Sequence, residues 1–151
     1  MRQSSTPFTR NLTVLAVGFA ALACGDITGV DPEDLAGTWR AVTAVATNAA
    51  DRTETADLVE AGVTITFIVE ANGRVESVIE FPGLVDTDIG TLTVTDGEFV
   101  LTFDGAVSTG TIKRRFDVLE LDILTGIEWD FGDDGLDEPA TLYLAMQRDQ
   151  T

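Results

Sequence analysis

The chain has 151 residues, with 26 acidic and 9 basic side chains and a net charge of −17 at pH 7. It contains no histidine, which excludes Ser-His-Asp and Cys-His catalysis and the common imidazole zinc sites. A surface this acidic repels phosphate backbones, so we expect no nucleic-acid partner. Paired carboxylates remain as the one catalytic option. Carboxylates also serve solubility, and we expect a protein that is not an enzyme.

The N-terminal segment predicts export. Arg2 and Arg10 precede an uncharged run over residues 12–23, which ends in small residues before Cys24, the only cysteine. This order is typical of a secretory signal peptide over residues 1–23. The residues Ala21-Leu22-Ala23-Cys24 resemble the lipobox of bacterial lipoproteins. The resemblance implies that Cys24 is diacylated and becomes the mature N-terminus.

This segment has two other interpretations. Ala21 and Ala23 also satisfy an ordinary signal peptidase, which would give a soluble periplasmic or secreted protein. A transmembrane anchor would need more than twelve apolar residues, which span about 18 Å of a ~30 Å hydrocarbon core. An unpaired thiol at Cys24 would be reactive in an oxidising compartment, and acylation would convert this free thiol into a thioether. We therefore expect a lipid-anchored protein of the bacterial cell envelope, in the outer membrane, that contacts the membrane through Cys24.

The exported part has the size of one domain. Removal of residues 1–23 leaves 128 residues, with 7 basic against 26 acidic side chains and a net charge of −19. Residues 24–34 form a tether that ends in a short helical turn, because Asp31 and Pro32 are typical of a helix start. Gly37 ends this turn early. The remaining residues, 35–151, form the domain.

From Gly37 onward apolar residues alternate with polar ones, which is the period of strands. The predicted strands are residues 37–47, 63–69, 75–81, 89–94, 99–103, 106–114, 119–123 and 142–146. Asn-Gly or Asp-Gly pairs at residues 72–73, 96–97 and 104–105 predict tight hairpins, and Asn72-Gly73 fits a type I′ turn. Residues 48–60 are expected to form a helical turn or a lid-like loop, and residues 126–138 form an acidic, glycine-rich connection.

Eight short strands in this order predict an all-β fold, a single antiparallel up-and-down β-barrel. An open sheet of this kind has a free edge at each end, and closure into a barrel removes both edges. A β-sandwich is the alternative architecture.

The sequence Leu35-Ala36-Gly37-Thr38-Trp39 resembles the opening of a lipocalin domain, in which a Gly-x-Trp element follows a short helical turn. Residues 57–62, 64–67, 72–73 and 130–148 are similar to the small bacterial lipocalin-like lipoproteins. The resemblance implies that Trp39 lies at the closed end of the barrel under Arg148 from the last strand, a cation–π pair. The alternative is that Trp39 is ordinary core and Arg148 is solvated.

Lipocalins bind small apolar molecules inside the barrel, so the resemblance implies a small hydrophobic ligand. The candidate lining residues are Phe67, Phe81, Phe99, Phe103, Leu121 and Leu144. An eight-stranded barrel is just wide enough to hold one small ligand or to be filled by its own side chains. The alternative is therefore a non-enzymatic envelope interaction or structural lipoprotein with a filled barrel.

An acidic loop is the second candidate site. Asp130, Asp134 and Glu138 lie in a glycine-containing stretch, with a spacing that partly matches a calcium loop. The alternative is a solvated connection between strands, which most acidic glycine-rich loops are. Calcium is the one cofactor that the sequence suggests, and the sequence leaves the oligomeric state open.

Overall fold

The structure, a computed structural model, describes residues 30–132 and 134–150. The predicted signal peptide (residues 1–23), Cys24 and residues 25–29 of the tether lie outside this part. Within it the chain forms one short helix and nine strands. They are α1 (Pro32–Leu35), β1 (Gly37–Asn48), β2 (Thr55–Asp57), β3 (Thr64–Val69), β4 (Arg74–Phe81), β5 (Leu84–Thr95), β6 (Glu98–Phe103), β7 (Ala106–Arg115), β8 (Val118–Trp129) and β9 (Glu138–Arg148).

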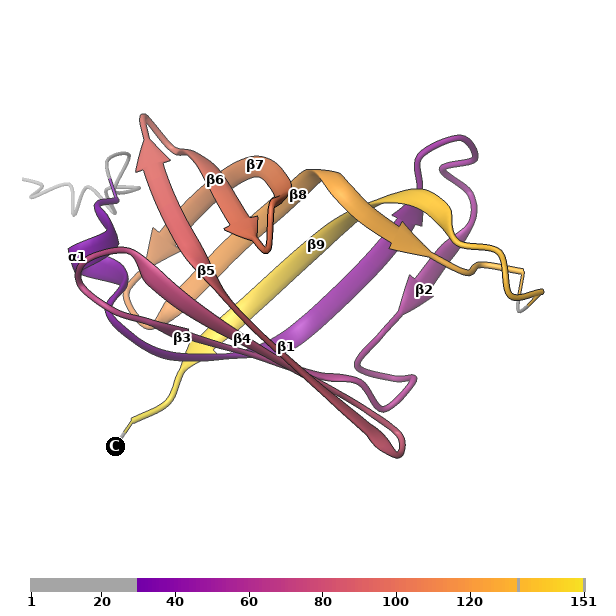
Figure 1. The fold of residues 1–151 in the computed structure, drawn as a ribbon, viewed down its shortest axis with the longest axis horizontal. Coiled ribbons are helices and arrows are strands. Elements are labelled where there is room, and N and C mark those ends of the chain that lie inside the picture. Colours follow the sequence, from indigo (N-terminus) through magenta and orange to yellow (C-terminus); the bar gives the residue numbers. More distant parts are fainter. Residues whose placement is uncertain (1–29, 133, 151) are drawn as a thin grey trace, which may run out of the picture.

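The strands form a closed antiparallel β-barrel. Each strand from β3 to β9 pairs with the next along the chain, β1 pairs with β3, and β9 returns to pair with β1 (Figure 1). Eight strands close the barrel and β2 is an addition at its rim. The predicted all-β, up-and-down barrel is confirmed, and the sandwich alternative is wrong.

The strand β2 was not predicted. Residues 48–60 were expected to form a helical turn or a lid-like loop, but Thr55–Asp57 pairs with the second half of β1. The first half of β1 pairs with β3 only from Gly37 to Arg40, so the rest of that edge is free to accept another strand. Three residues are too few to display a period of two, which is why the alternation gave no signal.

The tight hairpins predicted at the two Asp-Gly pairs are confirmed, whereas the turn at the Asn-Gly pair differs from the prediction. Asp96 and Gly97 both have positive φ (53° and 81°), as a two-residue type I′ turn requires. At the β3–β4 turn only Gly73 does (φ 84°), and its N–H donates to Glu70 O at 2.9 Å. The predicted type I′ turn is therefore wrong, because the loop contains three residues and ends in a glycine bulge.

The barrel interior is packed with apolar side chains from every strand of the closed barrel. The largest fully buried ones are Trp39, Phe99, Leu35, Leu119, Leu144, Met146 and Val75. Gly110 permits a close approach of β7 and β8. It lies opposite a register shift that leaves Leu124 of β8 without a paired residue, and a Cβ at this position would overlap the backbone carbonyl of Asp122 and lie 2.9 Å from the ring of Phe99.

The first half of β5 keeps a free edge. Residues 84–89 of β5 pair with β4 but have no partner on the other side, because β6 pairs with β5 only from Gly90 to Thr95. Asp86 and Asp88 lie in this stretch. Charged side chains on an edge are a common device against unwanted strand pairing.

Replacement of Gly110 by alanine should destabilise the barrel. The new methyl group needs space that Asp122 and Phe99 occupy, and overpacking of this kind costs about 1–3 kcal/mol. We expect a lower midpoint in thermal or urea unfolding for Gly110→Ala. Gly132→Ala is the control, because the nearest atom to its Cβ would be 3.6 Å away. Equal midpoints for the two variants would contradict the argument.

Candidate functional site

The closed end of the barrel is built around Trp39 and Arg148. The two residues are partners across β1 and β9, and the guanidinium carbon of Arg148 lies 5.4 Å from the centroid of the Trp39 ring. Trp39 is fully buried, and its indole N–H donates to Leu35 O at 2.7 Å. Arg148 also donates to the backbone carbonyl of Ala36. These contacts attach α1 to the barrel, and the expected cation–π geometry is present.

The glycine of the Gly-x-Trp element has a specific role at this end. Gly37 has a φ of +142°, and a Cβ at this position would lie 2.8 Å from Nε of Arg148. A side chain here would displace the guanidinium from its place over Trp39. The short sequence Gly37-Thr38-Trp39 is therefore a packing requirement of the closed end.

The core side chains of β3 to β8 enclose only a small space. The space enclosed by the core side chains measures about 10 Å³, which is the volume of roughly one water probe. Small-molecule pockets are typically 300–1,000 Å³ in order of magnitude, about thirtyfold larger or more. The residues around this space are Phe67, Val69, Val75, Leu92, Phe99, Leu101, Ile112, Leu119, Leu121 and Ile123.

The six expected ligand-lining residues do not form one pocket. Phe67, Phe99 and Leu121 contact the small interior space and are buried. Leu144 is fully buried in the core. Phe81 and Phe103 are partly buried and pack against the core from the end of the barrel opposite α1. Admission of a ligand would require several of these side chains to move apart.

The acidic loop uses its carboxylates to hold its own backbone. Asp130 accepts hydrogen bonds from the N–H groups of Asp134 (3.2 Å) and Gly135 (2.7 Å). Asp134 accepts from the N–H of Leu136, and Glu138 accepts from the amide of Asn48 at 3.3 Å. In residues 30–132 and 134–150, no three His, Cys, Asp or Glu side chains are grouped closely enough to hold a metal ion.

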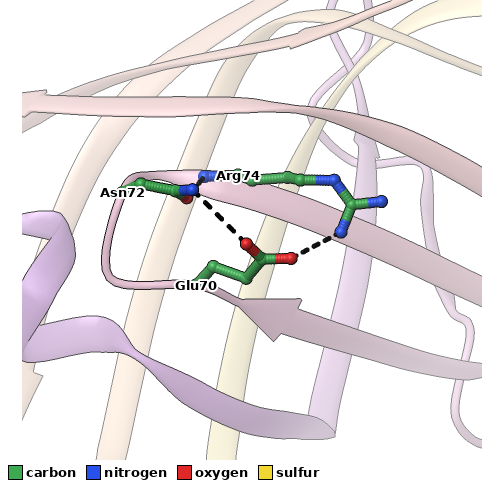
Figure 2. Close-up of polar contacts among 3 residues, drawn as sticks. All are labelled: Glu70, Asn72 and Arg74. Atoms are coloured by element: carbon green, nitrogen blue, oxygen red, sulfur yellow. Dashed lines mark hydrogen bonds and ion pairs between the residues drawn. The ribbon is translucent and has the colours of Figure 1, made fainter.

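A polar cluster stabilises the β3–β4 hairpin (Figure 2). Arg74 donates to Glu70 Oε1 at 2.6 Å, and its backbone N–H donates to Asn72 Oδ1 at 2.8 Å. The ion pair is about half exposed, and exposed pairs contribute only about 0–1 kcal/mol. A shallow surface hollow lies beside it, between Arg74 and the outer face of β5. Because Glu70 already pairs with Arg74, we interpret the cluster as a turn support.

The outer face of β5–β8 carries a hollow of about 390 Å³ that the sequence did not indicate. It is lined by Thr93, Thr95, Glu98, Phe99, Val100, Thr109, Gly110, Thr111 and Leu124. Some of its hydroxyls are engaged across strands: Thr109 and Thr125 share a hydrogen bond at 2.8 Å, and Thr111 donates to Asp122 at 3.5 Å. These bonds stabilise strand pairs, and threonines on separate strands give no local sequence signal.

Two groups have shifted pKa values. The hydroxyl and the backbone N–H of Thr53 donate to Asp51 and lower the pKa of its carboxyl. Burial, followed by the nearby carboxylates of Glu120 and Asp122, raises the pKa of Tyr143. Asp51 lies in the loop before β2 and Tyr143 on the outer face of β9. Neither residue lines the interior space.

These features define the described part of the chain as a closed antiparallel β-barrel with a short helix at one end. Comparison of the chain with known protein families, with curated proteins and with solved structures finds no match. Within the described part of the chain, no helix has the length and apolarity that crossing a bilayer requires.

Replacement of Arg148 by alanine should weaken the closed end. The variant loses the contact with Trp39 and the hydrogen bond to Ala36, together worth about 1–3 kcal/mol. Arg40→Ala is the matched control. Arg40 is exposed, and its ion pair with Asp149, at a distance of 3.8 Å, contributes little to the stability of the fold. Thermal unfolding should show a lower Tm for Arg148→Ala alone. The same Tm for both variants would refute this role of Arg148.

Proposed function

We propose that the protein is a lipid-anchored, non-enzymatic component of the bacterial cell envelope, whose filled barrel acts as a rigid interaction or structural module. The observation that carries this proposal is the interior space of about 10 Å³ between the core side chains. A carrier of hydrophobic molecules needs a cavity of ligand size, whereas a scaffold is most rigid when its interior is packed.

The surface and the N-terminal segment support the same proposal. The exported part is strongly acidic, which favours solubility beside a membrane. The residues before Cys24 have the order of a lipoprotein signal, and α1 lies only a few residues further along the chain. In this arrangement the acyl chains supply the membrane attachment and the barrel supplies the exposed module.

The purified protein should carry no non-covalent lipid-sized adduct beyond its own acyl groups in native mass spectrometry, and it should not bind benzene. Phe99→Ala should bind benzene, because removal of the ring leaves an apolar cavity next to the interior space. Val100→Ala, which truncates a neighbouring exposed side chain, is the control without benzene binding. If Phe99→Ala fails to fold, Leu121→Ala provides a smaller cavity at the same place.

A co-purifying hydrophobic molecule on the wild-type protein would contradict the filled-barrel proposal. That outcome would favour the carrier function, in which the core side chains move apart around a ligand. Benzene binding by the wild type would have the same meaning. A wild-type protein that has no bound hydrophobic molecule and does not bind benzene supports the scaffold function.

Replacement of Cys24 by serine should release the protein from the membrane fraction. Serine offers no thiol for the diacylglycerol group, and two acyl chains or an equivalent second signal are needed for stable anchoring. Fractionation of cells that express Cys24→Ser, with mass spectrometry of the wild-type mature N-terminus, tests this expectation. A variant that stays with the membranes as the wild type does would refute the anchor.

A further inference from the structure

The loop between β7 and β8 exposes an aromatic ring. Phe116 is 85% exposed, the highest value among the large hydrophobic residues of the described chain. It occupies the first position of a two-residue loop, Phe116-Asp117, between the paired residues Arg115 and Val118. Burial of an aromatic ring is strongly favourable, so an exposed ring on a hairpin tip is a candidate contact.

The backbone at this tip is strained as well. Phe116 has a φ of 54°, whereas the corresponding first positions of the β5–β6 and β6–β7 loops are Asp96 and Asp104, each followed by glycine. Aspartate tolerates positive φ through local hydrogen bonds, but a bulky aromatic side chain is an outlier there. A residue that is both strained and exposed does not serve the stability of the fold, and strained positions of this kind are concentrated at functional sites.

The tip lies at the same end of the barrel as α1. Arg114, next to it on β7, donates to the backbone carbonyl of Asp34 in α1 at 2.7 Å. The backbone N–H of Arg148 donates to Asp117 O at 2.9 Å, which fixes the loop beside the closed end. Val30, the first described residue, lies two positions before α1, with the N-cap Asp31 between them. Five residues separate Val30 from Cys24, and the six steps between the two Cα atoms reach at most about 20 Å when extended.

The charges around Phe116 suit a lipid headgroup region. Lys113, Arg114 and Arg115 form the only run of basic residues in the chain, and Lys113 is exposed. Asp117 and Glu120 lie nearby, and Asp31, Glu33 and Asp34 lie at α1 on the same end, so carboxylates offset this basic charge. The binding energy should therefore come mainly from the ring, with the basic side chains beside the phosphates. A weak dependence on anionic lipid follows.

We propose that Phe116 is a second membrane contact, and that its ring inserts among the headgroups of the bilayer that holds the anchor at Cys24. This inference rests on the proposed lipid anchor, which keeps the tip close to the surface and raises its effective concentration there. Docking of the tip orients the barrel with α1 toward the membrane and with the β4–β5 and β8–β9 loops away from it.

The experiment uses the acylated full-length protein in phosphatidylcholine vesicles, with a nitroxide label on Val118→Cys beside the ring. Because acylation occupies the thiol of Cys24, the introduced cysteine is the only one to react. The label at residue 118 should be accessible to oxygen and shielded from a water-soluble nickel chelate. A label on Leu84→Cys, at the tip of the β4–β5 hairpin and 62% exposed, is the control and should show the reverse.

Introduction of Phe116→Asn into the Val118→Cys protein should abolish the shielding. Asparagine tolerates positive φ, so this variant keeps the loop and removes only the ring. Shielding at 118 that is lost with Phe116→Asn and absent at 84 supports the proposal. Addition of phosphatidylglycerol to the vesicles should change the shielding less than twofold, because the acidic side chains at this end offset the basic run at residues 113–115.

Other outcomes overturn the proposal in distinguishable ways. An acylated protein whose label at 118 stays accessible to nickel refutes the docking and leaves the anchor intact. A mature chain without acyl groups, detected by mass spectrometry, refutes the anchor and the docking together. Shielding at 118 only after envelope proteins are added would assign the ring to a protein partner. Equal shielding at 118 and 84 would refute the end-on orientation.

Discussion

The closed barrel depends on the pairing of its first and last strands, and Arg148 is the residue that reinforces this closure. Its guanidinium lies over the buried ring of Trp39 and donates to the carbonyl of Ala36, so one side chain links β9, β1 and the residue after α1. The link requires Gly37, because any side chain there would occupy the same space. Without the closure, β1 and β9 would each present a long unpaired edge.

The repeating parts of the fold could be predicted because they have local causes. Alternation located each of the eight barrel strands, and Asp-Gly at residues 96–97 and 104–105 marked true two-residue hairpins. The predicted ends of β5, β8 and β9 were wrong: β5 begins at Leu84, and β8 and β9 extend to Trp129 and from Glu138, inside the expected connection of residues 126–138. The prediction failed where the cause was not local. Asn72 and Gly73 belong to a three-residue loop rather than a two-residue turn. Thr55–Asp57 forms a strand because part of β1 has an unpaired edge next to it. Neither result can be read from the residues of the segment alone.

The candidate sites were harder to predict, because they depend on how side chains from different strands meet. The inward positions of Phe67, Phe99 and Leu121 follow from alternation, but the space left between them depends on the packing of the whole interior. The spacing of Asp130, Asp134 and Glu138 does not show where their side chains point. In the structure these carboxylates accept hydrogen bonds from backbone N–H groups and from Asn48. Phe116 gave no sequence signal, since an aromatic residue between two strands is ordinarily assigned to the core.

The joining of β1 to β9 also has a consequence for the order of events in folding. Arg148 and Ala36 are 112 residues apart in the sequence, so the contact that closes the barrel is among the most distant in the chain. A polypeptide that emerges with its N-terminus first presents β1 long before β9 exists. The hairpins between β3 and β8 can form in the meantime, because their contacts are local, whereas β1 waits with an open edge. Completion of the barrel is thus coupled to completion of the chain.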